Sequence, residues 1–259
     1  MAPLSVKLSV LDVCVVSSIS YGCESWAVSR IKSAEVMYRL GLKRALSIRE
    51  CTPTEIVYLE SNRLPLYIRI EKQQLNFWKT LTKYLAENQH HPLQKLINQG
   101  RDLGSTYLAY YESLSNNYGD PSACVAAHTR EFSDCTKRKF EAIADPGSPL
   151  GTYNIVNPEL QFHISAIHML EFERILVSRY RCGSHNLRVE SGRLCNPKIP
   201  RENRICICGL DIQTLHHCLF DCPLLQDLRN EFLYESVADV LAGNDAPKIL
   251  MKLEAKLKI

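Results

Sequence analysis

The sequence predicts a mostly α-helical protein. Apolar side chains recur at helical spacing in residues 30–48 and again in residues 65–87, with basic residues between them. A proline suited to the first turn of a helix follows Thr52 and stands again at position 65. The C-terminal residues 245–259 alternate Lys with Ile and Leu, which is typical of an amphipathic helix.

The first helix that we expect covers residues 4–20 and is mostly buried, although its β-branched Val and Ile residues make a strand the competing interpretation. Tyr21-Gly22 ends it, and Trp26 then supplies an apolar anchor. In residues 52–55, Thr-Pro-Thr-Glu, we expect the threonine at position 52 to cap the next helix.

Further along the chain, residues 93–143 are predicted to be helical, and a strong helix is predicted to begin at Asn157-Pro158 and to extend to Leu176. Phe77 and Trp78 stand beside lysines and could stack on nucleotides, but aromatic residues at helical spacing are more often core, and we expect core.

The clearest break in the chain is the Pro- and Gly-rich segment 145–151. We therefore expect a helical region at 1–88, a helical connector at 89–150 and a C-terminal helical domain at 151–259.

Composition narrows the class of protein and its setting. The formal net charge of +3 over 259 residues is too small to imply nucleic acid by itself. Eleven cysteines, an odd number at irregular spacing, and the lack of Asn-x-Ser/Thr favour a reducing intracellular setting, cytoplasmic or nuclear. No apolar run reaches the about 18 residues that span a bilayer, so we expect no membrane partner. Residues 8–19 are apolar enough for a signal peptide, but Asp12 interrupts them.

The densest group of metal-ligating residue types lies in residues 206–222. Thiolate and imidazole ligands at short spacing suit Zn²⁺, which takes four such ligands in a tetrahedron. The best set is Cys206, Cys208, His217 and Cys222, with Cys195, His216 and Cys218 as spare candidates. One residue separates Cys206 from Cys208, where two to four are usual in zinc sites. The alternative is that these are reduced, partly buried cysteines beside a polar turn.

A basic, loop-like stretch leads into this group. Between residues 179 and 204 seven Lys and Arg residues face only Glu190 and Glu202. Such a loop beside a zinc knuckle suits phosphate contacts, and the alternative is a solvated loop with local ion pairs. The candidate nucleic-acid contacts are His185, Arg188, Arg193, Arg201 and Arg204.

Two separated parts of the chain resemble LINE-type (non-LTR) retrotransposon reverse transcriptases. The first resembles the step from the palm into the helical thumb and comprises Tyr21-Gly22-Cys23-Glu24-Ser25-Trp26, Thr52-Pro53, residues 64–70 and Phe77-Trp78. The second resembles the C-terminal CCHC region and comprises residues 184–193, Pro200-Arg201-Glu202 and residues 204–223. The matches cover roughly residues 10–80 and 160–235.

The resemblance implies a thumb-like helical bundle at 1–88 and a CCHC zinc knuckle at 206–222 that contacts an RNA template or target DNA. The one-residue gap after Cys206 departs from the family's usual two. The polymerase of that family needs paired palm aspartates for its two metal ions, and this sequence has no Asp-Asp pair. We therefore expect a C-terminal, non-catalytic piece, whether decayed or domesticated.

No motif indicates another enzyme, since the sequence has no Gly-x-Ser-x-Gly, no phosphate-binding Gly-rich loop and no His-Glu-x-x-His. The sequence therefore predicts a non-catalytic nucleic-acid-binding fragment without a small-molecule substrate. Two alternatives remain: a helical protein-interaction or scaffold protein with a structural zinc, and a retroelement remnant without function.

Overall fold

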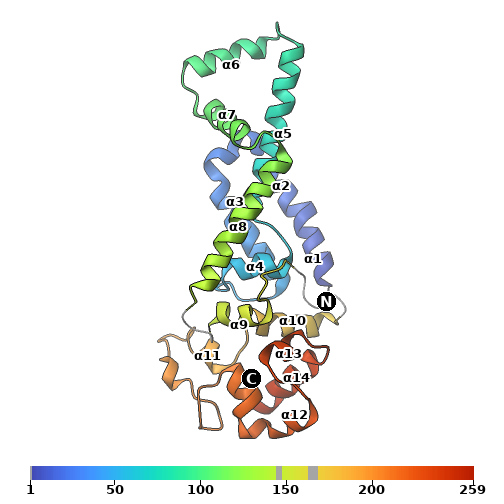
Figure 1. Ribbon diagram of the computed structural model, residues 1–259, viewed down its shortest axis with the longest axis vertical. Helices are drawn as coiled ribbons and strands as arrows, with labels where there is room; N and C mark the ends of the chain where they lie inside the picture. The colour runs from blue at the N-terminus through green and yellow to red at the C-terminus, as the bar shows by residue number, and fades with distance from the viewer. Residues whose placement is uncertain (1, 144–147, 163–168) are drawn as a thin grey trace. The chain divides into compact units, whose positions relative to one another are not determined.

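The computed structural model describes residues 2–143, 148–162 and 169–259, leaving aside the side chains of residues 26–30. The described residues are mostly α-helical, as predicted, and their only β-type pairing is an isolated bridge between Ile205 and Ile212 (Figure 1). No helix among them is both long and apolar enough to cross a membrane.

The chain divides into two compact units. Unit 1 comprises Met1–Leu8, Gly41–Arg63 and Lys137–Ile259, and unit 2 comprises Ser9–Leu40 and Leu64–Thr136. The three regions predicted from the sequence stay a prediction. Two long helices, α3 (Cys23–Leu46) and α8 (Pro121–Glu141), contribute residues to both units.

Unit 2 is built largely from α-helices that the sequence predicted. The N-terminal helix runs through α1 (Leu4–Val10), a π-helical turn at Leu11–Val16 and α2 (Ser17–Ser20), and it belongs to unit 2 only from Ser9 onward. It is followed by most of α3, by α5 (Leu66–Glu87), α6 (Pro92–Asp102) and α7 (Thr106–Tyr118), and by the first part of α8.

Apolar side chains from α5, α7 and α8 form a small core in unit 2. Leu75, Leu114 and Cys124 are buried together. Trp78 stacks on Tyr111 with ring centroids 5.3 Å apart. Phe77, in contrast, is 43% exposed, so the expectation of a core position was right for Trp78 and wrong for Phe77.

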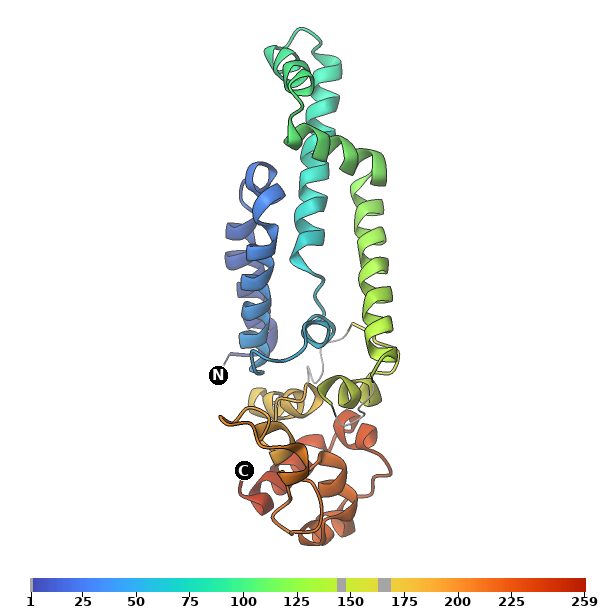
Figure 2. The same ribbon diagram turned by 90° about the vertical axis from the view of Figure 1, so that its left-hand side faces the viewer.

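Unit 1 gathers shorter helices around a larger core. Its helices are α4 (Thr54–Ser61), α9 (Pro149–Val156), α10 (Glu171–Arg181), α11 (Arg188–Ser191), α12 (Gln226–Glu231), α13 (Val237–Ala242) and α14 (Ala246–Leu257). Figure 2 shows the C-terminal helices, in red, packed together with the segment before them, in orange. The core joins Val177 and Tyr180 of α10 to Cys206 and Cys222 and to Leu250 of α14.

Two expected helix starts were wrong for identifiable reasons. Thr52 does not cap α4. Its hydroxyl lies 2.9 Å from the hydroxyl of Ser184 in the interior of unit 1, and Pro53 occupies the N-cap position. Residues 157–162 are not helical, because the Asn157 side chain exchanges hydrogen bonds of 3.0 Å with the backbone of Gln161 in a turn, and α10 begins at Glu171.

Several expectations fall on residues outside the described part of the chain. These are the Trp26 side chain, residues 145–147 of the predicted break and residues 163–168 of the predicted helix. The second half of the predicted break, from Pro149, forms α9.

A buried carboxylate connects three helices of unit 1. Glu60 of α4 is fully buried, and its Oε1 lies 3.3 Å from Nε of Arg181 of α10. The hydroxyl of Tyr153 of α9 donates to Oε2 at 3.1 Å. A buried charge of this kind is tolerated only because it is both paired and hydrogen-bonded.

Arg181→Met should therefore destabilise unit 1 strongly, because it leaves the Glu60 charge buried without its cation. We expect a loss of about 3–5 kcal/mol in the free energy of unfolding, measured by urea titration. Lys137→Met is the matched control, because the Lys137–Glu141 pair is 4.0 Å apart and exposed. It should cost less than about 1 kcal/mol. Equal losses in the two variants would contradict this account of Glu60.

Candidate metal centre

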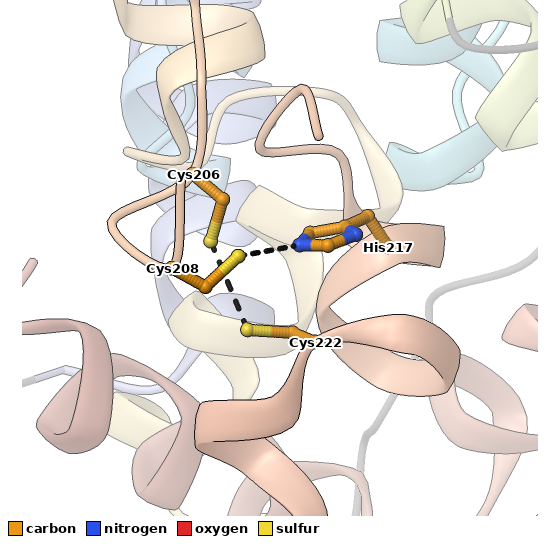
Figure 3. A group of neighbouring side chains, drawn as sticks. All are labelled: Cys206, Cys208, His217 and Cys222. Atoms are coloured by element: carbon orange, nitrogen blue, oxygen red, sulfur yellow. Dashed lines mark hydrogen bonds between the residues drawn. The ribbon is translucent and has the colours of Figure 1, made fainter. Parts of the chain in front are cut away.

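The first two ligands lie on a tight turn. The Ile205–Ile212 bridge closes this turn, and the amide of Cys206 donates to the carbonyl of Asp211 at 2.7 Å. Gly209 takes a φ of +80°, which lets the chain reverse directly after Cys208. The reversal brings the side chains of Cys206 and Cys208 to the same side of the turn, despite the single residue between them (Figure 3).

The other two ligands are the first residue of a π-helical turn, His217–Asp221, and Cys222 directly after it. The hydroxyl of Thr214 accepts a hydrogen bond of 3.0 Å from the amide of His217, which fixes the start of this turn. The amide of Cys222 donates to the carbonyl of His217 at 2.8 Å, five residues back. This wide turn aims the imidazole and the Cys222 sulfur at the same point (Figure 3).

The four side chains meet at distances that suit a tetrahedral metal ion. Their ligand atoms all lie within 4.8 Å of one another. Sγ of Cys206 is 3.8 Å from Sγ of Cys222, and Sγ of Cys208 is 3.2 Å from Nε2 of His217. With metal–sulfur bonds of about 2.3 Å, two sulfur ligands of a tetrahedron lie about 3.8 Å apart. The cysteines are free, since a disulfide would bring two sulfurs to about 2.05 Å.

Electrostatics of the cluster favour a cation. Burial and the neighbouring Cys206 raise the pKa of Cys222 to about 12. Burial also acts to raise the pKa of Cys208, but the Leu210 amide and His217 outweigh it and lower that pKa to about 7. Sulfurs this close cannot all be thiolates in a low-dielectric site unless a cation compensates their charge.

Two polar side chains lie next to the ligands. The carboxylate of Asp211 lies 3.9 Å from Nδ1 of His217, the ring nitrogen that faces away from the sulfurs, which is too far for a hydrogen bond. Gln213 is fully buried, and its Nε2 donates to Sγ of Cys206 at 3.9 Å. A hydrogen bond such as that of Gln213 helps to orient a metal ligand.

The spare ligand candidates lie outside this group of four. His216 is exposed, with Nδ1 3.4 Å from the carboxylate of Asp221. Cys195 is also exposed, and its Sγ contacts the carbonyl of Ser191. Cys218 is fully buried, and burial followed by the charge of Cys206 raises its pKa, as expected of a thiol that packs as an apolar side chain.

The candidate nucleic-acid contacts are not equivalent in the structure. Arg204 donates to the carbonyls of Ile199 and Val189 at 2.8–2.9 Å, and Arg193 pairs with Glu190 at 2.5 Å. Arg188 is exposed but uses one nitrogen to donate to the carbonyl of Ile205 at 2.8 Å. Arg201 is exposed.

His185 lies in the interior, contrary to the sequence-based expectation. It is 5% exposed and stacks on Tyr180 with ring centroids 4.7 Å apart. In this fold its side chain does not reach the surface, so it does not belong to a nucleic-acid contact set.

No known protein family, no curated protein and no solved structure matches this chain. The interpretation of the site therefore depends on its own geometry.

Removing the metal ligands should loosen unit 1. Cys222→Ser deletes a buried ligand, and we expect it to abolish stoichiometric metal binding at this site and to lower the melting temperature of metal-loaded protein. Cys195→Ser, an exposed cysteine outside the group, should change neither quantity. Metal content by mass spectrometry and thermal unfolding followed by circular dichroism measure both. Unchanged binding in Cys222→Ser would contradict the four-ligand site.

A second prediction concerns acid. Burial, followed by the charges of Arg49 and Arg193, lowers the pKa of His185 to about 3. An unfolded chain protonates this histidine near pH 6.5, so the stabilising contribution of neutral His185 is complete above that pH and is lost as the pH falls toward 3.

Wild-type protein should lose about 2 kcal/mol more stability than His185→Gln between pH 7 and pH 5, measured by urea unfolding. His90→Gln, which removes an exposed histidine, is the control and should follow the wild type. Parallel profiles for the wild type and His185→Gln would show that His185 does not titrate across the folding transition.

Proposed function

We propose that Cys206, Cys208, His217 and Cys222 hold one Zn²⁺ ion, and that the loop around this zinc site contacts the phosphates of RNA or DNA. In this proposal the protein is a non-catalytic nucleic-acid-binding fragment, similar to the thumb and CCHC parts of a LINE-type reverse transcriptase. The observation that carries it is the convergence of the four ligands from a tight turn and a π-helical turn.

The donor set favours Zn²⁺ among common metal ions. Three sulfurs and one imidazole nitrogen are soft or borderline ligands, which Mg²⁺ and Ca²⁺ avoid. Four protein ligands leave no open position, which is typical of structural zinc rather than catalytic zinc.

The zinc site and the basic loop are mechanically connected. Arg188 donates to the carbonyl of Ile205, directly before the first ligand. Arg204, two residues before the first ligand, donates to the carbonyl of Val189 and so connects α11 to the same turn. A guanidinium carries five N–H donors, so Arg188 has further donors for a phosphate after bonding Ile205. The exposed Lys198 and Arg201 lie on the same loop, and we assign the phosphate contacts to these three residues.

The attraction that we expect for phosphates is therefore local. The global charge of +3 is weak, but long-range attraction matters less than contacts within a Debye length of about 8–10 Å. Arg193 and Arg204 serve the fold in this proposal, because their donors are directed at Glu190 and at backbone carbonyls.

One observation favours a second candidate, a helical interaction protein in which zinc is only structural. Phe77, Tyr84 and Tyr107 of unit 2 are each more than 40% exposed. Exposed aromatic side chains are enriched where proteins bind one another. This alternative predicts that the basic loop of unit 1 has no ligand, and a remnant without function would likewise bind no nucleic acid.

Fluorescence anisotropy with a labelled RNA hairpin and a labelled DNA duplex tests the proposal. The zinc-loaded chain should bind at micromolar concentration or below, and its affinity should fall linearly on a log–log plot against salt. Arg188→Ala/Arg201→Ala should reduce that slope by about 1.4–1.8, at about 0.7–0.9 for each lost phosphate contact.

The matched control removes two positive charges elsewhere in unit 1. Lys248→Ala/Lys252→Ala changes exposed lysines of α14 by the same net charge and should leave the slope unchanged. Equal loss in both double variants would indicate nonspecific attraction. No binding by zinc-loaded protein would reject the nucleic-acid function and favour the alternatives.

A further inference from the structure

A second cluster of metal-ligating side chains lies in unit 2. Glu71 of α5 meets Cys124 and His128 of α8, and their ligand atoms all lie within 4.8 Å of one another. Cys124 and His128 are buried and are four residues apart, so they share one face of the helix. None of these residues belongs to the ligand group of unit 1.

The contact between Glu71 and His128 differs from an ordinary hydrogen bond. Oε2 of Glu71 lies 2.5 Å from Nε2 of His128, yet neither ring nitrogen of His128 makes a hydrogen bond of acceptable geometry. A carboxylate oxygen and a neutral ring nitrogen are both ligand types that divalent ions of the Zn²⁺ class accept. Sγ of Cys124 is the third candidate ligand atom of the cluster.

Neighbouring side chains surround the imidazole of His128. Its other ring nitrogen, Nδ1, lies 3.5 Å from the carboxylate of Glu131, one turn further along α8, without a hydrogen bond between them. The rings of Tyr67 and Tyr118, with centroids 5.5 Å and 5.0 Å from the imidazole, restrict its rotation.

An ion could reach the cluster through Glu71. Its side chain is 19% exposed and helps to line a groove of about 520 Å³, together with Tyr67 and residues of α3. Water in this groove could supply a ligand that the three side chains do not.

We propose that Glu71, Cys124 and His128 form a second metal site for a divalent ion of the Zn²⁺ class, with water as the fourth ligand. The ion would tie α5 to α8 inside unit 2. One sulfur, one nitrogen and one oxygen donor exclude Ca²⁺ and Mg²⁺ as preferred occupants, and three protein ligands leave one position open. Without the ion, Glu71 and His128 lie in contact with each other and Cys124 packs in the small core of unit 2.

Metal stoichiometry of the full chain, without an affinity tag, tests this site independently of the first one. Protein stripped with a chelator under reducing conditions is reloaded with Zn²⁺ and desalted, and its zinc is measured by mass spectrometry. The wild type should retain two equivalents. Cys124→Ser and His128→Gln should each retain one, Cys222→Ser should retain one, and Cys124→Ser/Cys222→Ser should retain none.

The matched control is Cys135→Ser, a cysteine of the same helix outside the cluster, which should keep two equivalents. If Cys124→Ser or His128→Gln loses helical circular dichroism, Glu71→Gln provides the same test with the side-chain volume preserved.

The outcomes separate the two sites. A single equivalent that Cys124→Ser, His128→Gln and Glu71→Gln all retain overturns the second site. A single equivalent lost in those variants and retained in Cys222→Ser supports the second site and rejects zinc at the first. Equal loss of zinc in Cys135→Ser and Cys124→Ser also overturns the proposal.

Discussion

Three sulfurs and one imidazole nitrogen in a small volume are the constraint on which the C-terminal part of unit 1 depends. Cys206 and Cys222 are buried members of the core that also contains Leu219, Leu225 and Leu250. Helix α14 packs against this core, and so does the turn that carries the ligands. A cation that converts the thiols to thiolates would therefore act on the packing of the whole core rather than on an isolated loop.

The arginines before the ligands show why charge in a sequence is an incomplete guide to a binding surface. Arg193 and Arg204 satisfy a carboxylate and backbone carbonyls, and Arg181 neutralises the buried Glu60. Loops without regular structure leave many carbonyls without partners, and a guanidinium can satisfy several of them at once. Loss of binding after mutation of Arg204 would therefore report a changed loop rather than a lost phosphate contact.

Local patterns predicted the parts of this structure that local physics decides. Helix α5 follows from apolar spacing after Pro65, and α14 follows from the alternation of Lys with Ile and Leu. The ligand group of residues 206–222 was predictable because its members are close in sequence and chemically distinctive. Thr52 was assigned wrongly because its capping signal is local, whereas its actual partner, Ser184, is 132 residues away.

Long-range partners also explain what the sequence did not reveal. His185 resembled a surface residue beside basic neighbours, but the ring of Tyr180 and the burial of the surrounding core decide its position. The spacing of Cys124 and His128 on α8 was a visible signal, since residues at i and i+4 share a helix face. The spacing alone does not indicate a metal site, because the third candidate ligand, Glu71 of α5, is distant in sequence and is brought close only by the fold.

The two ligand clusters differ in the way expected of sites with different dependence on metal. The first has four protein ligands on two turns with little regular structure, and its two buried sulfurs, Cys206 and Cys222, cannot both be thiolates without an ion. The second joins two long helices whose apolar contacts already hold them, including Leu75 of α5 and Cys124 of α8. An ion there adds to an existing structure and leaves one coordination position to solvent. Loss of metal should therefore unfold the turns of unit 1 locally, while unit 2 keeps its helices and loses only the cross-link between them.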